Sequence, residues 1–194
     1  MSSQTSQDQE KIEAYLLVIE QRILEPLQET EVRRYCTATL LLLFAAIDGL
    51  GQLLHPNKNA GSGNRILKFL DYMGGDYRVR KRELLRLRNS LVHNAIADSF
   101  LSKTEMGDDQ HLKKRDTDSF VHVNTTVVHK DFVDALAKFR ADIKLNSTMM
   151  KLAADRLEWE EAADRSERGE GNPLDHQNSA TPSPPPPVRF IREK

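Results

Sequence analysis

One segment of this chain restricts the fold more than any other: the run from Ala38 to Ile47, which is apolar at every position except Thr39. A helix with apolar side chains on all faces must be surrounded by other elements. The run is shorter than the roughly 20 apolar residues that a membrane-spanning helix needs. The sequence therefore predicts a soluble bundle around a central helix at about residues 31–54, with no membrane partner.

Further helices are predicted where apolar residues recur every three or four positions. Their approximate bounds are residues 10–27, 66–73, 76–94 and 131–163. Asp76 is a suitable N-cap for the third of them, and the fourth is expected to bend near residues 146–148. We therefore predict an all-α domain of about five helices in residues 1–165.

Two segments depart from the helical pattern. Residues 96–103 and 120–128 are rich in β-branched and aromatic side chains, which predicts a small β-hairpin before the last helix. Residues 166–194 contain six of the eight prolines. A run of prolines favours polyproline II and cannot join a packed core, so we predict a disordered, proline-rich tail.

The helix predicted over residues 76–94 is basic, although the chain as a whole has a formal net charge of −1. Its cations before the last turns are Arg78, Arg80, Lys81, Arg82 and Arg86. They are interpreted as an RNA-binding surface that contacts phosphates. The alternative is a solvated helix face, which charge alone favours.

The same helix ends in the string Arg88-Asn89-Ser90-Leu91-Val92-His93. An imidazole such as that of His93 is suited to proton transfer near neutral pH. The guanidinium of Arg88 can pair two phosphate oxygens and stabilise charge on phosphorus. Asn89 can donate to a phosphate oxygen or orient His93. These three residues are therefore the predicted catalytic residues for RNA cleavage by 2′-hydroxyl attack, without a metal or cofactor.

Helix geometry constrains this site. Asn89 and His93 are four residues apart and share a face, whereas Arg88 points roughly 140° away from His93 on an ideal helix. Three arrangements remain open: Arg88 reaches around the helix, the helix ends near His93, or a second subunit completes the site. A two-fold dimer would bring two such motifs into one cleft.

Asp48 interrupts the central apolar helix. A buried carboxylate needs a partner, and we predict that this partner is Arg88 or His93. Asp48 would then hold a catalytic residue in place without contacting the substrate itself. The alternative is an ordinary polar residue near a helix end.

The sequence from Leu87 to Asn94 resembles the HEPN superfamily of small helical-bundle proteins, and so does the upstream segment Phe44–Gly51. The resemblance covers about Lys11 to Ala163. It implies a metal-independent endoribonuclease that acts as a toxin or anti-phage effector. It also implies a homodimer with the active cleft at its interface and a regulatory partner such as an antitoxin. Arg88 and His93 carry over directly, and Asn89 less firmly.

One position departs from the family's pattern. Members paired with a nucleotidyltransferase antitoxin often have a tyrosine two places after the histidine, and here that residue is Ala95. Control by modification of such a tyrosine is therefore not expected.

The rival interpretation is a non-catalytic, dimeric helical module that binds RNA or a protein. A third is a regulatory adaptor whose tail recruits partners. A cytoplasmic location is expected for all three, because the single cysteine, Cys36, excludes an internal disulfide. The first ten residues also lack the basic start and apolar stretch of a signal peptide.

Overall fold

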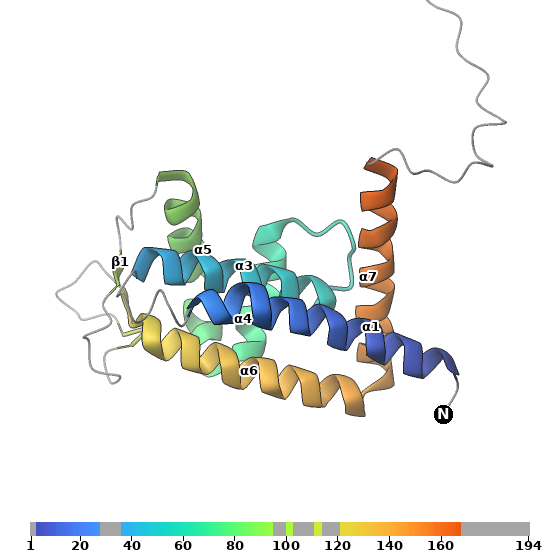
Figure 1. Cartoon of the computed structure of the whole chain (residues 1–194). Coiled ribbons are helices and arrows are strands. Elements are labelled where there is room, and N and C mark those ends of the chain that lie inside the picture. Colours follow the sequence, from blue (N-terminus) through green and yellow to red (C-terminus); the bar gives the residue numbers. More distant parts are fainter. Residues whose placement is uncertain (1–2, 28–35, 95–99, 103–110, 114–120, 168–194) are drawn as a thin grey trace, which may run out of the picture. The chain divides into compact units, whose positions relative to one another are not determined.

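The computed structural model describes residues 3–27, 36–94, 100–102, 111–113 and 121–167 (Figure 1). The elements are α1 (Ser3–Ile19), the π-helical turn η1 (Glu20–Leu24), α3 (Cys36–Leu54), α4 (Ser62–Met73), α5 (Gly75–Asn94), β1 (Phe100–Ser102), β2 (Val121–Val123), α6 (Thr125–Leu145) and α7 (Ser147–Glu167). The described residues thus form six α-helices and two short strands, which confirms the all-α class.

The chain divides into two units, residues 1–159 and residues 160–194, and the bundle lies in the first. In the second unit the structure describes only the last turns of α7, which continue to Glu167 and so pass the predicted domain boundary at residue 165. The rest of the predicted disordered tail lies outside the described residues.

The core helix of the bundle is α3, which packs against α4, α5 and α6. Its fully buried side chains include Leu40, Leu43, Ile47, Leu50 and Leu53. Over its whole length α3 is long and apolar enough to cross a membrane. The sequence prediction considered only the run from residue 38 to 47, which is too short to do so. Other helices of the same chain bury much of α3, as they do for the core helix of a bundle.

An aromatic cluster joins α4 to α6. Phe69 of α4 is completely buried and meets Phe132 and Phe139 of α6 at ring-centroid distances of 5.9 and 6.4 Å. Tyr72, one turn further along α4, stacks near Phe69 and meets Phe139 edge-on. Such offset and edge contacts are favourable arrangements of aromatic rings. The cluster fixes α4 on the bundle, and α4 supplies two residues of the candidate site.

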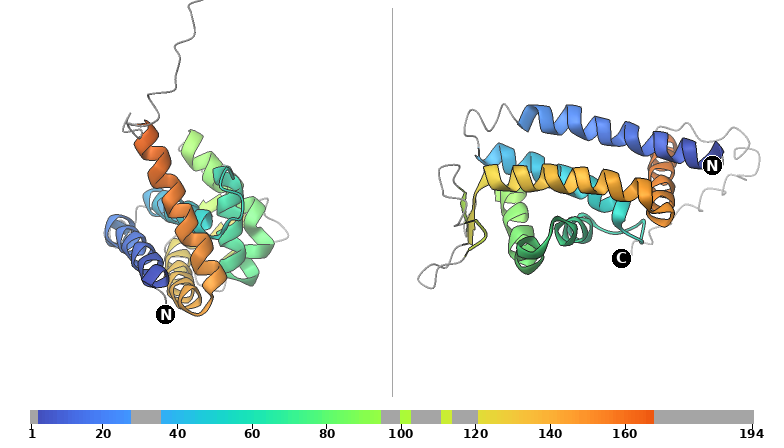
Figure 2. Two further views of the ribbon diagram at one scale, coloured as in Figure 1. Left: turned by 90° about the vertical axis from the view of Figure 1, so that its right-hand side faces the viewer. Right: turned by 90° about the horizontal axis from the view of Figure 1, so that it is seen from below.

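Helices α1 and α6 lie side by side, as Figures 1 and 2 show from different directions. Arg140 of α6 pairs with Glu13 at 3.1 Å and with Glu20 at 2.9 Å, while Ile12 and Leu16 of α1 are buried. Helix α1 starts at Ser3 instead of the predicted residue 10. Its polar start contains no helix breaker, so the helix extends beyond its apolar stripe.

The single helix predicted over residues 131–163 is in fact two helices. Asn146 adopts an extended backbone between them, where its N–H donates to the carbonyl of Asp142 in the last turn of α6. Its side-chain oxygen accepts from the N–H of Met149 in the first turn of α7. One asparagine thus ends one helix and caps the next, which is a common role for this residue.

The predicted β-hairpin is wrong. Strands β1 and β2 pair in parallel, with Phe100 opposite Val121, and parallel strands cannot be joined by a tight turn. Residues 124–128, predicted as strand, instead begin α6: the Asn124 side chain accepts from the N–H groups of Thr126 and Val127 and caps the helix. The β-branched residues in this first turn gave the sequence a strand-like composition.

Candidate functional site

The candidate site lies on α5, whose bounds confirm the helix predicted over residues 76–94. Arg82, Arg86, Asn89 and His93 are all exposed and follow one another at spacings of four, three and four residues. Residues at these spacings share one helix face. They therefore form a continuous solvent-facing row, called here the α5 stripe.

The five cations predicted to bind RNA divide into two groups. Three form ion pairs with carboxylates of the same chain: Arg78–Asp71, Lys81–Asp71 and Arg80–Glu83, at 3.8, 2.7 and 3.3 Å. The other two, Arg82 and Arg86, have no carboxylate partner within the part of the chain that the structure describes, and they belong to the α5 stripe. Their charge is therefore the more available to an anion.

Arg88 leaves α5 on a different side from the α5 stripe and is half-buried. Its Nη1 donates to the side-chain oxygen of Asn89 at 3.1 Å, and its Nη2 donates to the hydroxyl of Ser62 at 3.1 Å. The first contact draws the guanidinium towards Asn89, which shares its face with His93. Two of the three arrangements left open by the sequence fit this geometry: Arg88 reaches towards the face of Asn89, and α5 ends at Asn94, directly after His93. Completion of the site by a second subunit stays a prediction.

Asp48 of α3 meets Arg65 of α4, a residue that the sequence did not single out. The Nε of Arg65 donates to Oδ1 of Asp48 at 2.6 Å, and its Nη2 donates to Oδ2 at 3.2 Å. Ser62 donates its hydroxyl proton to Oδ2 at 2.6 Å. Asp48 is therefore linked to Arg88 through Ser62, in place of the direct contact predicted with Arg88 or His93.

A glycine allows α3 and α4 to come this close. A Cβ atom added at Gly51 would lie 2.0 Å from the backbone carbonyl oxygen of Arg65, nearer than non-bonded atoms can approach. Gly51 is three residues after Asp48 and shares its helix face. The contact between the two backbones thus holds the Asp48 carboxylate against the first turn of α4, where Ser62 and Arg65 lie.

His93 occupies the last turn of α5 with its side chain exposed to solvent. Among the described residues, no group forms a hydrogen bond with its imidazole. A ligand lying on the α5 stripe can therefore approach the ring without displacing part of the bundle. The predicted position of His93 at the end of a helix is confirmed, and its catalytic role stays a prediction.

A second polar cluster links α5 to α6 and to the short segment 111–113. The hydroxyl of Tyr77 donates to Asp131 at 2.8 Å and lies 3.0 Å from Nε2 of His111. Nδ1 of His111 accepts from the backbone N–H of Asn124 at 3.1 Å, so the imidazole proton of the neutral ring lies on Nε2. Burial, and the nearby Asp131 carboxylate, raise the pKa of Tyr77. The hydroxyl stays protonated, which suits a structural link.

Tyr72 provides a test of the packing between α4 and α6. Burial, assisted by a hydrogen bond to Asp142, raises the pKa of Tyr72 from its usual 10.0 to about 12. A raised pKa contributes stability that is complete below pH 10 and is lost as the pH rises towards 12. We expect Tyr72→Phe to be less stable than the wild type below pH 10, and the difference to shrink between pH 10 and 12. Chemical denaturation at several pH values measures it, and a pH-independent difference would contradict this.

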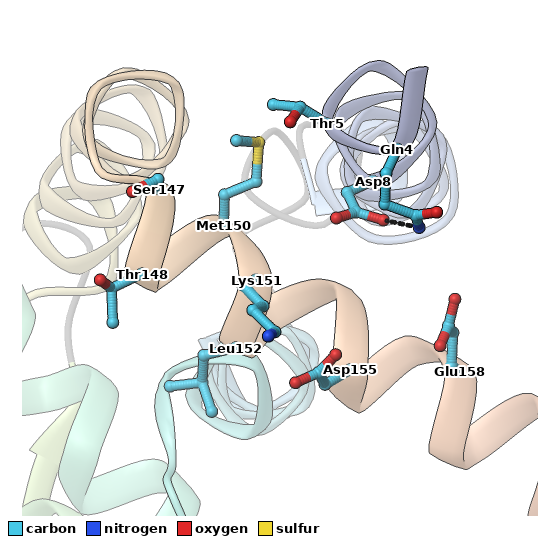
Figure 3. Close-up of a pocket in the computed structure, with 10 residues that line it drawn as sticks. All are labelled: Gln4, Thr5, Asp8, Ser147, Thr148, Met150, Lys151, Leu152, Asp155 and Glu158. Atoms are coloured by element: carbon cyan, nitrogen blue, oxygen red, sulfur yellow. Dashed lines mark hydrogen bonds between the residues drawn. The ribbon is translucent and has the colours of Figure 1, made fainter. Parts of the chain in front are cut away.

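Figure 3 shows an open hollow between the first turns of α1 and of α7, with a volume of about 720 Å³. Its lining combines apolar surface, including Met150 and Leu152, with the carboxylates of Asp8, Asp155 and Glu158 and the ammonium of Lys151. Asp8 already accepts a hydrogen bond from Gln4 at 2.9 Å. The lining that the structure describes contains no histidine or cysteine, so this hollow lacks the proton-transfer group present on α5.

No protein-family model, curated protein or solved structure matches this chain. Among the residues that the structure describes, no group of three or more histidine, cysteine, aspartate or glutamate side chains is placed to hold a metal ion. The resemblance to the HEPN superfamily therefore rests on the string from Arg88 to His93 and its surroundings in the sequence.

Proposed function

We propose that this protein is a metal-independent endoribonuclease of HEPN type, active in the cytoplasm as a homodimeric toxin or anti-phage effector. The observation that carries the proposal is the hydrogen bond from Arg88 to Asn89 beside an exposed His93. It brings a phosphate-binding cation towards the face that carries a proton-transfer group. Cleavage of RNA without a metal requires both functions near one phosphate.

The reaction follows from these roles. The ribose 2′-oxygen bonds to phosphorus, the bond to the 5′-oxygen breaks, and the proton lost by the 2′-hydroxyl is balanced by one gained by the leaving oxygen. His93 takes up or supplies one of these protons, because an imidazole exchanges protons readily near neutral pH. Arg88 stabilises the negative charge that grows on the phosphorus-bound oxygens. The products are a 2′,3′-cyclic phosphate and a 5′-hydroxyl.

The path of the RNA is proposed along the α5 stripe. Arg82 and Arg86 lie one helical turn apart and precede His93 on the same face. They supply positive charge for the backbone of the substrate, and such contacts make binding depend on salt. Arg78, Arg80 and Lys81 contribute less, because each is already paired with a carboxylate.

The direct test is cleavage of a single-stranded RNA by the purified protein in excess chelator, with analysis of the product ends. We expect cleavage that persists in chelator and leaves 2′,3′-cyclic phosphates. Failure to cleave at protein concentrations above that of the RNA, or recovery of activity only after a divalent metal is added, would contradict the proposal.

A second function has an observation of its own. Val79 and Val92 of α5 are 71% and 48% exposed, and at helical spacing they flank the α5 stripe on opposite sides. A partner that lies along the stripe would therefore contact apolar as well as charged side chains. A non-catalytic module would use this face to bind RNA, a second copy or a regulatory protein such as an antitoxin. Binding of RNA without any cleavage, together with loss of self-association in Val92→Asp measured by sedimentation, would favour that module.

A further inference from the structure

Arg65 and Arg88 both lie near Asp48, but only Arg65 pairs with its carboxylate. We propose that Arg65 is a positioning residue for Arg88. By occupying the carboxylate of Asp48, Arg65 prevents that carboxylate from capturing the Arg88 guanidinium, which stays available to an RNA phosphate. The role assigned to the phosphate rests on the proposed function, whereas the competition between the two arginines for Asp48 does not.

The contact between Arg65 and Asp48 is strong enough for this task. Two N–H groups of the guanidinium meet the two carboxylate oxygens, at 2.6 and 3.2 Å. Such two-point pairing of arginine with a carboxylate is stronger and more directional than a single hydrogen bond. The side chains are only 26% and 19% exposed, so water screens this pair less than a pair on the open surface.

Ser62 separates the pair from Arg88. Its hydroxyl has one proton, which goes to Asp48 at 2.6 Å, and its oxygen accepts from Nη2 of Arg88 at 3.1 Å. Arg88 is therefore held by neutral groups, and no carboxylate of the described residues pairs with its guanidinium. A guanidinium has five N–H donors, and the contacts with Ser62 and Asn89 leave others for a ligand.

Loss of Arg65 would change this arrangement. The Asp48 carboxylate would remain half-buried without its cation, which is costly. Arg88 already bonds to the hydroxyl that touches this carboxylate, so a small rotation of its long side chain would bring the two charges into direct contact. The guanidinium of Arg88 would then move away from Asn89, its contact with the α5 stripe. If the charge of Asp48 were removed as well, no carboxylate would attract Arg88, and Arg88 would stay beside Asn89.

The experiment is a double-mutant comparison of Arg65→Met, Asp48→Asn and the variant with both changes. The probe is a single-stranded RNA oligonucleotide in which 2′-fluoro groups replace the 2′-hydroxyls, so that it binds but cannot be cut. We expect Arg65→Met to bind this probe roughly ten-fold more weakly, because the loss of one charged hydrogen bond to phosphate has about this effect on affinity. The double variant should return to within about three-fold of the wild type, because coupled residues are not additive.

The rescue distinguishes positioning from a merely structural role. If Arg65 only held α3 to α4, the double variant would bind the probe at least as weakly as Arg65→Met, and that result would overturn the inference. Arg65→Lys is the conservative control, and it should retain most of the binding because its ammonium still pairs with Asp48. Thermal melting of each variant confirms that it is folded.

A second readout does not require RNA. The side-chain Nε–H signal of Arg88 can be followed by nitrogen-15 NMR and assigned by its loss in Arg88→Lys. We expect the signal to shift in Arg65→Met and to return in the double variant. An unchanged signal in Arg65→Met would overturn the inference even if the wild type cleaves RNA. A shift and return in a protein that neither binds nor cleaves RNA would instead refute the proposed function and leave the competition for Asp48 standing.

Discussion

Replacing His93 by alanine is expected to lower the rate of RNA cleavage by roughly 10² to 10⁴-fold, the usual contribution of a general acid or base. The side chain is exposed and makes no packing contact that the core depends on. The free energy of unfolding and the affinity for uncut RNA should therefore change little. Single-turnover cleavage with excess protein measures the rate of the chemical step directly.

Two further variants sharpen this result. Arg88→Ala is expected to lower both the cleavage rate and the affinity for RNA, because a cation that binds the phosphate acts before and during the reaction. His129→Ala replaces a histidine of α6 that has no proposed role in cleavage and should retain activity. Cleavage by His93→Ala at the wild-type rate would exclude His93 from the chemistry, whatever the other variants do.

Replacing Gly51 by alanine is expected to destabilise the fold by roughly 1–3 kcal/mol, within the range for forcing an extra group into a packed interior. The new Cβ would lie 2.0 Å from the carbonyl oxygen of Arg65. This obstacle is backbone, so no side-chain rotation relieves it and α3 must move away from α4. Chemical denaturation measures the loss, and RNA cleavage should fall too, because the contacts of Asp48 with Ser62 and Arg65 loosen.

Gly75→Ala is the matched control. Gly75 begins α5, and a Cβ added there would meet no atom within 4 Å. Alanine favours a helix over glycine by about 1 kcal/mol, so this variant should be as stable as the wild type or slightly more so. Equal stability of the two variants would show that α3 and α4 do not meet at Gly51 as closely as the structure has them.

The sequence predicted the elements that carry strong local signals. Helix α3 follows from an apolar run that only a bundle interior can accept, and α5 follows from its basic and apolar pattern. The predicted N-cap is wrong, because α5 begins at Gly75 and Asp76 lies inside its first turn. Of the α5 stripe, the sequence placed Asn89 and His93 on one face, which the exposure of both side chains agrees with. These features depend on residues close together in the chain, where the physics of one helix decides the outcome.

The contacts between elements were not predictable in this way. Ser62 lies outside the helix predicted over residues 66–73, yet it is the first residue of α4. Asp48 signalled that a partner was needed, but only the packing of α3 on α4 selects Arg65. The parallel pairing of β1 with β2 likewise depends on a long connection whose direction the alternating pattern does not specify.

The contacts around Asp48 join residues that are close together in the chain. Asp48 and Ser62 are 14 residues apart in the chain, Asp48 and Arg65 are 17 apart, and Ser62 and Arg88 are 26 apart. Lys11 and Glu158, which tie α1 to α7, are 147 apart. Closing short loops costs less entropy and happens faster than bringing distant segments together. We therefore expect the candidate site to assemble early, as a local unit of α3, α4 and α5, before α1 and α7 come into contact.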